Sequence, residues 1–249
     1  MESEELKEET LLSHLVELRS RLLKAGGCIL VLFICMAPFS DFIFSSVALP
    51  LMRQLPEGSS MIATQVASPF LTPFKTTMFA ALFLSMPVVL YQVWSFAAPG
   101  LYYKEKRFAV PLLISSIALF YLGTVFAYVV VFPIVFAFFT SAAPTGVAVM
   151  TDIASYLDFV LVLFFAFGVA FEVPIATVIL VWSGLTTVEA LKKNRAYVFL
   201  GAFVIGMLVT PPDIISQTLL AVPVYLLYEC GILLARILSK PKESLEENE

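Results

Sequence analysis

The chain has 249 residues, of which 60% are hydrophobic and only 14% are charged, and its mean hydropathy is +0.94. A soluble domain carries about 25% charged residues, so this composition excludes an ordinary soluble protein and indicates a polytopic helical membrane protein. The net charge of −4 does not argue for nucleic acid binding, because the acidic residues gather at the two ends of the chain. Three cysteines without paired spacing and a single histidine, His14, give no reason to expect a disulfide, a metal or a cofactor.

The N-terminal region divides into a polar tail, an amphipathic segment and a first span. Residues 1–10 are acidic and are predicted to form a disordered tail. The following segment, 11–23, places its leucines on one helical stripe, with Glu17 and Arg21 four residues apart on another. That spacing by itself predicts only a local ion pair.

The first span is predicted over 22–39, and a long proline-containing connection over 40–73 is predicted to fold into a cap outside the membrane. Further apolar stretches complete one transmembrane domain over 11–236, followed by a C-terminal tail over 237–249. These five spans are predicted over 74–97, 108–139, 156–182, 196–210 and 214–235.

The spans differ in length, and several contain proline. The stretch 108–139 is longer than a bilayer requires, whereas 196–210 is short. Proline inside a helix removes one hydrogen bond and bends the axis. We therefore predict an all-α membrane protein whose six transmembrane helices, several of them kinked, form a curved wall with a concave face.

Basic residues predict the orientation of the chain. With six spans both termini lie on the same side, and all but two of the 15 Lys and Arg residues lie on that side. The exceptions are Arg53 and Lys75. Because positive residues favour the cytoplasmic side, both termini are expected to be cytoplasmic.

Glu172 is the only ionisable side chain between Phe159 and Trp182. A charged carboxylate at mid-membrane costs about 2.5–3.5 kcal/mol, so such a residue normally faces protein or water. It serves either as a structural hydrogen-bonding group or as a polar contact for a docking helix or a proton relay. Glu229 lies near the cytoplasmic end of its span and is expected to extend toward Arg236.

Two further carboxylates, Glu17 and Glu105, are placed at the same membrane face by this topology. Each can bind a guanidinium through paired N–H···O bonds, which are stronger than neutral hydrogen bonds. Although each residue alone fits a solvated surface, together they fit a receptor for a doubly basic peptide.

Six sequence motifs stand out along the chain: HLVELRSRL (His14–Leu22), ATQVASPFLTPF (Ala63–Phe74), YQVWSFAAPGLYYKEKR (Tyr91–Arg107), TDIASY (Thr151–Tyr156), GVAFEVPIA (Gly168–Ala176) and GMLVTPPDIISQTLLAVP (Gly206–Pro223). Together they resemble the motifs of the TatC family, whose members are the multispanning receptor subunits of twin-arginine protein translocases. The resemblance runs from about Leu11 to Arg236, with the motifs in the expected order.

The resemblance implies a receptor, not an enzyme, in the bacterial inner membrane. It would bind Arg-Arg signal peptides of folded cargo at the cytoplasmic face. It would also organise single-span TatA- and TatB-type partners into an oligomeric complex driven by the protonmotive force. The residues implied are Glu17, Arg19, Phe96 and Glu105 for signal recognition, Glu172 for an intramembrane polar contact, and Pro50 and Asp213 in external loops.

Other functions fit the residues less well. A proton-coupled small-molecule transporter could use Glu172, but the chain shows no internal repeat of the kind common in transporters. An intramembrane enzyme would need a catalytic constellation that the spans lack. A purely structural scaffold differs from a receptor in failing to bind peptide.

Overall fold

The computed structural model of the chain describes residues 2–53, 61–97, 106–141, 150–209 and 214–239. Almost all of these residues are helical, and the only strand-like pairing among them is one isolated parallel bridge between Ile62 and Asp152. The all-helical fold class is therefore confirmed. Two compact units are present, one of Met1–Phe44 with Pro73–Ile117 and the other of Ser45–Thr72 with Ala118–Glu249.

Within the described residues, four helical stretches are long and apolar enough to cross a membrane. A bent pair of helices, α3 (Ser68–Leu84) and α4 (Met86–Ala97), provides a fifth if it counts as one span. Helix α11 (Arg195–Val209) is apolar but shorter. The multi-pass membrane character is thus confirmed, whereas the count of six spans and the concave wall stay predictions. The four long stretches are Leu15–Met52, Val110–Ser141, Ile153–Trp182 and Ile214–Leu238.

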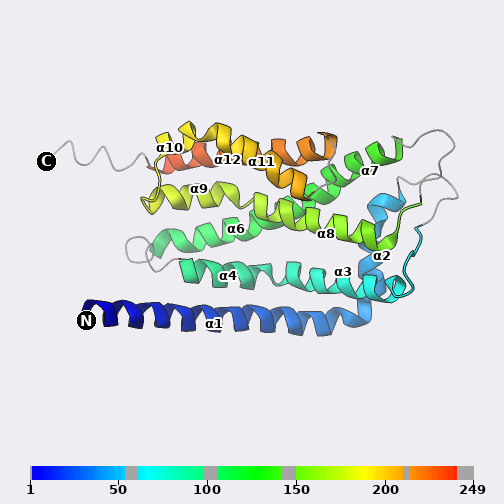
Figure 1. The fold of residues 1–249 in the computed structure, drawn as a ribbon, viewed down its shortest axis with the longest axis horizontal. Coiled ribbons are helices and arrows are strands. Elements are labelled where there is room, and N and C mark those ends of the chain that lie inside the picture. The colour runs from blue at the N-terminus through cyan, green and yellow to red at the C-terminus, as the bar shows by residue number, and fades with distance from the viewer. Residues whose placement is uncertain (1, 54–60, 98–105, 142–149, 210–213, 240–249) are drawn as a thin grey trace. The chain divides into compact units, whose positions relative to one another are not determined.

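The first unit is built on helix α1 (Glu2–Met36), which packs along α4 (Figure 1). Helix α1 includes residues 2–10, for which the sequence predicted a disordered tail. Glu, Leu and Lys are good helix formers, and acidic residues are favourable near a helix N-terminus. These propensities oppose the charge-based argument for disorder. A short 3-10 turn, η1 (Ala37–Phe39), then leads to helix α2 (Ser40–Met52).

The predicted span 74–97 is bent by 52° between α3 and α4. The cause is Pro87, which has no N–H to donate and clashes with the preceding turn. At the break the Ser85 hydroxyl donates to the Leu82 carbonyl at 2.7 Å, and the Ser85 carbonyl accepts the N–H of Val88 at 2.9 Å. Ser85 thus makes hydrogen bonds at the break with both its side chain and its backbone.

The long third span contains a wide turn in place of a simple kink. Helices α6 (Lys106–Phe126) and α7 (Phe132–Ser141) are joined by a π-helical turn, η2 (Ala127–Val131). Its closing bond runs from the Phe132 N–H to the Ala127 carbonyl, five residues back. Pro133 follows directly, and the wider turn accommodates a proline ring that a regular helix would exclude.

Helices α8 (Ile153–Ala170) and α9 (Val173–Trp182) form the stretch that is most buried of the four. Helix α8 packs against η2 and α7 through a seam of aromatic rings. Its closest pair is Phe132 and Phe164, with ring centroids 4.9 Å apart, and Phe126 contacts Phe167 at 5.6 Å. Such aromatic ring pairs each add about 0.5–1.5 kcal/mol beyond their buried area.

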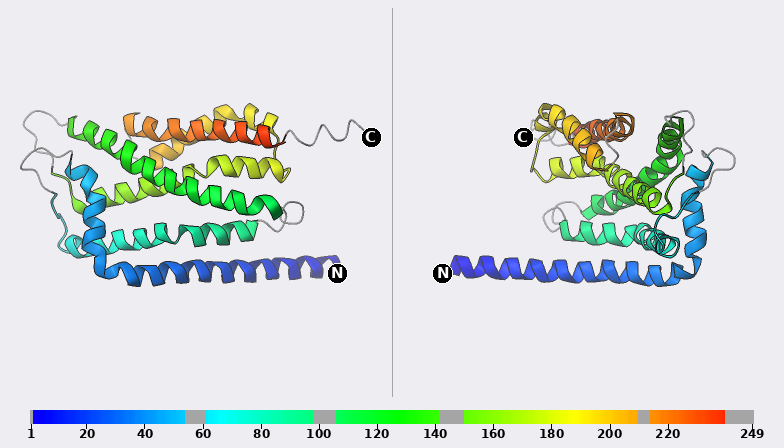
Figure 2. Two further views of the ribbon diagram at one scale, coloured as in Figure 1. Left: turned by 180° about the vertical axis from the view of Figure 1, so that it is seen from behind. Right: turned by 45° about the vertical axis from the view of Figure 1, so that its right-hand side comes forward.

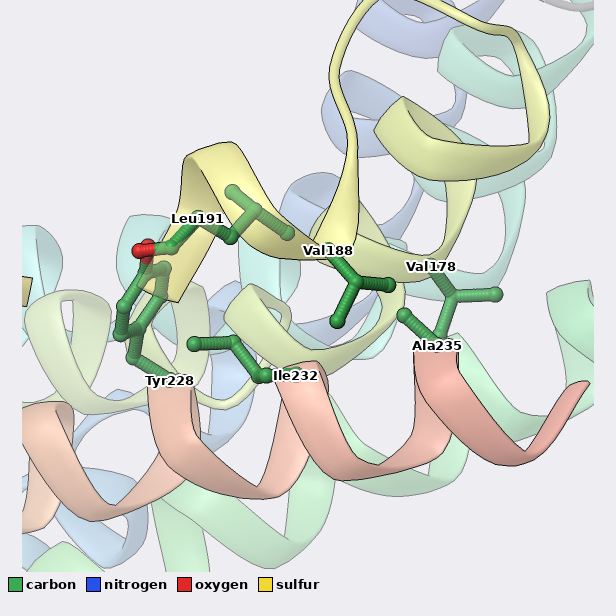
Figure 3. Close-up of a cluster of buried hydrophobic side chains, with 6 residues drawn as sticks. All are labelled: Val178, Val188, Leu191, Tyr228, Ile232 and Ala235. Carbon is green, nitrogen blue, oxygen red and sulfur yellow. The ribbon is translucent and has the colours of Figure 1, made fainter. Parts of the chain in front are cut away.

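The second unit continues with a short helix, α10 (Val188–Lys193), followed by α11 and then α12 (Ile214–Ser239), which lies beside α11 (Figure 2). Helix α10 lies in a segment that the sequence indicated only as polar. Its two buried apolar residues, Val188 and Leu191, join a hydrophobic cluster with α9 and α12 (Figure 3). The rest of that cluster is Val178, Tyr228, Ile232 and Ala235.

Helices α9 and α12 approach each other very closely at Gly231. A Cβ atom at this position would overlap the Thr177 hydroxyl oxygen and would lie 2.9 Å from the Pro174 Cα. Small residues allow membrane helices to pack backbone to backbone, which increases their dispersion contacts. The contact fixes the start of α9, where the intramembrane carboxylate Glu172 lies.

Candidate functional site

Glu17 lies on α1, and its carboxylate is bound by a guanidinium from the same helix. Arg21 donates to the Glu17 Oε1 atom from Nε at 2.9 Å and from Nη2 at 2.5 Å. Its remaining terminal nitrogen, Nη1, is 3.4 Å from the Gln92 side-chain oxygen on α4. The ion pair that the spacing predicted is present, and it also connects α1 to α4.

The other residues predicted for signal recognition are Arg19, Phe96 and Glu105. Phe96 is half-buried and follows Gln92 by one turn of α4, so the two share a helix face. Arg19 is exposed on α1 and, two residues from Glu17, does not face it. Glu105 lies outside the described residues. The structure therefore brings Glu17 to the helix that carries Phe96 and leaves the Glu105 prediction untested.

Glu172 sits at the break between α8 and α9, as the residue that precedes the first turn of α9. Its Oε1 atom is buried, so at least one carboxylate oxygen faces protein. The Glu172 N–H donates to the Val169 carbonyl at 3.0 Å, and its own carbonyl accepts the Ala176 N–H at 2.9 Å. Pro174 cannot donate, which explains why the helix is interrupted here and why a polar residue is tolerated.

A second set of polar contacts joins segments that are far apart in the sequence. Asp152 caps α8 by accepting the Ser155 N–H at 3.0 Å, and it also accepts the Thr64 N–H at 3.0 Å and the Thr64 hydroxyl at 2.9 Å. The hydrogen bonds from the Ser155 and Thr64 N–H groups hold the pKa of the Asp152 carboxyl well below its usual range. Backbone bonds pair Ile62 with both neighbours of Asp152, at 3.0 and 2.9 Å.

Helix α2 is attached to the same region. The Tyr156 hydroxyl donates to the Val47 carbonyl at 2.9 Å, and the Tyr128 hydroxyl donates to the Ser46 carbonyl at 3.1 Å. Pro50 is buried within α2. These hydrogen bonds attach α2, part of the connection that the sequence predicted to be folded, to α8 and η2. Asp213, the other external-loop candidate, lies outside the described residues.

Glu229 has a different partner from the one expected. Its Oε2 accepts a hydrogen bond from the Arg195 Nη2 at 2.5 Å, so the carboxylate pairs with α11 and not with Arg236 of its own helix. Gln217 makes a second link between these helices, donating to the Phe203 carbonyl at 2.8 Å. The two contacts connect α11 to α12 at separate levels.

Sequence reasoning assigned no role to Gln92, Asp152 or Gln217, although each lies in a motif that it singled out. One signal was present: Asp152 precedes an apolar helix and is followed three residues later by Ser155, a spacing typical of an N-cap. No local signal could have indicated Thr64 as its partner, 88 residues away. Among the described residues, no cluster of His, Cys, Asp and Glu could hold a metal ion.

Comparisons with known proteins agree with this architecture. The family model described as Sec-independent protein translocase protein (TatC) matches residues 13–223. The TatC protein of Azotobacter chroococcum mcd 1 is 60% identical over 222 residues, which cover 89% of this chain and 87% of the relative. The TatC protein of Escherichia coli K12 is 57% identical over 228 residues, which cover 92% and 88%.

A crystal structure of the twin arginine translocase receptor TatC superposes on this chain with a TM-score of 0.80 at 37% identity. The match covers 90% of this chain and 98% of that one. The fold is that of a multi-pass α-helical membrane protein, and the matched family is one of protein translocase components and not of enzymes. The chain belongs to the TatC family and is a component of a bacterial twin-arginine translocase.

Proposed function

We propose that this chain is the signal-peptide receptor of its translocase. Glu17 and Glu105 bind the Arg-Arg pair of a signal peptide on folded cargo, and Arg19 and Phe96 complete the site. The observation that carries the proposal is the Glu17 carboxylate, which already binds a guanidinium through two N–H groups at 2.9 and 2.5 Å. A carboxylate in this arrangement favours the planar guanidinium of arginine over the point charge of lysine.

The site is placed on the cytoplasmic side of the inner membrane. The distribution of Lys and Arg supports six spans with both termini cytoplasmic. In that topology the N-terminal part of α1 and the segment containing Glu105 share one face. Glu17 lies close to Leu15, where the first apolar stretch begins, and this supports a position of Glu17 at the membrane boundary.

The apolar part of the signal peptide extends from this site along the concave wall toward Glu172. The buried Oε1 of Glu172 supports an inward-facing polar group that can contact an incoming helix. TatA- and TatB-type single-span subunits assemble with the receptor in an oligomeric complex and supply the passage, driven by the protonmotive force. External segments that include Pro50 and Asp213 keep the receptor in a transport-competent form.

An equilibrium binding assay tests the recognition site. Purified receptor in detergent is titrated with a fluorescent signal peptide that carries either Arg-Arg or Lys-Lys. Glu17→Gln and Glu105→Gln are expected to weaken binding of the Arg-Arg peptide at least tenfold, because each loses a charged hydrogen-bond acceptor. Glu189→Gln, at an exposed position of α10, is the matched control and should bind as the wild type does. Unchanged affinity in both site variants would refute the proposal.

The role of Glu172 is tested separately. Glu172→Ala should reduce export of a folded reporter and co-purification of the single-span subunits, while affinity for the free signal peptide stays within about twofold. Normal export and partner assembly in this variant would leave Glu172 with only a structural role.

A further inference from the structure

The guanidinium of Arg21 lies at the point where the proposed function places the arginine of a signal peptide. It donates twice to one carboxylate oxygen, Glu17 Oε1, and its third contact is the Gln92 oxygen on α4. The Arg21 side chain is 22% exposed and that of Glu17 is 39% exposed, so the arginine is the less accessible of the two. The resident cation is therefore held between two helices, with the carboxylate toward the surface.

From this arrangement we propose that Arg21 is an autoinhibitory, affinity-setting residue, a resident guanidinium that competes with the arginine of a signal peptide for the Glu17 carboxylate. The inference rests on the proposed function, because it assumes that Glu17 binds the peptide. An incoming arginine competes with Arg21 for the same oxygen atom. Only receptors in which Arg21 does not occupy Glu17 can bind the peptide there. The observed affinity is therefore the intrinsic affinity multiplied by the fraction of such receptors.

The resident pair acts on every cationic peptide alike, because the fraction of receptors with Glu17 occupied is set before any peptide binds. A guanidinium presents a rigid fork of N–H donors and can reproduce the Arg21 contacts at the carboxylate. A lysine ammonium is a compact, strongly hydrated charge without that fork, so it replaces them less well. The preference for arginine over lysine therefore comes from the Glu17 carboxylate, and Arg21 lowers the affinity for both peptides by the same factor.

The first consequence concerns affinity. Arg21→Gln removes the competitor, so the Arg-Arg peptide is expected to bind about two- to fivefold more tightly, the range that corresponds to a partly exposed ion pair. Binding of the Lys-Lys peptide should tighten by the same factor, because the fraction of receptors in which Arg21 occupies Glu17 does not depend on which peptide is added. The ratio of the two affinities should consequently stay unchanged.

A matched control separates this effect from general electrostatics. Lys24→Gln removes one positive charge from the same helix, and Lys24 is exposed. Loss of any nearby cation favours a cationic peptide slightly, so the inference requires Arg21→Gln to tighten binding more than Lys24→Gln does. It also requires Arg21→Gln to leave the Arg-Arg to Lys-Lys ratio unchanged, since the competing pair acts on both peptides alike.

The experiment is a titration of purified full-length receptor in detergent with Arg-Arg and Lys-Lys peptides, using wild type, Arg21→Gln, Lys24→Gln and Glu17→Gln. If Glu17→Gln does not weaken binding, the proposed function fails. If Glu17→Gln weakens binding but Arg21→Gln does not tighten it beyond the control, this inference alone is overturned.

A conservative variant covers the case in which Arg21→Gln does not yield folded receptor. Arg21→Lys keeps the positive charge and removes the forked N–H donors of the guanidinium. It should increase affinity for the Arg-Arg peptide by a smaller factor than the one expected for Arg21→Gln. Wild-type or weaker affinity in Arg21→Lys would show that Arg21 positions Glu17 and does not compete for it.

Discussion

Substitution of Gly231 by alanine perturbs the contact that holds α12 against the start of α9. The added methyl would overlap the Thr177 hydroxyl oxygen and would lie 2.9 Å from the Pro174 Cα and 3.1 Å from the Thr177 Cβ. The hydroxyl could rotate, but the Pro174 backbone cannot move without shifting the helix. The two helices must therefore separate, or α9 must bend further at the break beside Glu172.

The magnitude follows from two opposing terms. Overpacking of a tight contact costs about 1–3 kcal/mol, and a clash with backbone belongs at the upper end. Alanine is favoured over glycine in a helix by about 1 kcal/mol. We expect a net loss of about 2 kcal/mol in the free energy of unfolding. Thr177→Ala in the same chain removes the overlap with the hydroxyl but not with Pro174, so it should restore roughly half of the loss.

The assay is reversible unfolding of the purified protein in mixed micelles. The free energy of unfolding is obtained by extrapolating the unfolding data to native conditions. Gly27→Ala is the control, since a Cβ at that position of α1 would meet nothing within 4 Å. This control should be neutral or stabilised by up to about 1 kcal/mol. Equal stability of Gly231→Ala and Gly27→Ala would refute the reasoning that the α9–α12 contact is tight.

Three further predictions concern polar contacts of the second unit. Because the folded-state pKa of Asp152 lies below its ordinary value of about 3.8, the stabilisation by this carboxylate is complete above that pH and is lost only as the pH falls toward the lower folded value. The stability difference between wild type and Asp152→Ala should therefore be constant from pH 5 to 8, and a decline inside that window would contradict the capping role. Tyr156→Phe removes the bond to the Val47 carbonyl and should lower the free energy of unfolding by about 1–3 kcal/mol, since it leaves a polar group without its donor; a change below about 0.3 kcal/mol would count against this link. Arg195→Met and Glu229→Met should show a coupling of about 0.2–1 kcal/mol in a double-mutant cycle, the range for partly exposed pairs, whereas additive effects would show that the ion pair contributes nothing.

The sequence predicted the helices well because long apolar runs leave few alternatives to a helix in a bilayer. It also predicted that proline would kink several of the spans, since a proline removes a backbone donor wherever it stands; the irregularities occur near Pro87, Pro133 and Pro174. The form of each irregularity was not predictable. One proline gives a bend of 52°, another follows a π-helical turn, and the third opens the break that carries Glu172.

Contacts between distant segments account for most of what the sequence did not predict. Glu229 was assigned to Arg236 because the two side chains are seven positions apart on the same helix. Its observed partner, Arg195, comes from the neighbouring helix. Asp152 and Thr64 meet only because the connection after α2 folds back to the start of α8. The ion pair of Glu17 with Arg21 was predicted from spacing alone, yet its link to Gln92 depends on how α1 packs along α4.

The central claim is that carboxylates at one membrane face receive the arginine pair of a signal peptide. The most direct test uses a peptide with a photoactivatable group beside the Arg-Arg pair, irradiated with the receptor and analysed by mass spectrometry. The account predicts adducts both on α1 around Glu17 and on the turn that contains Glu105, and loss of both with a Lys-Lys peptide. Adducts on neither segment, on only one of them, or at equal yield with the Lys-Lys peptide would contradict it.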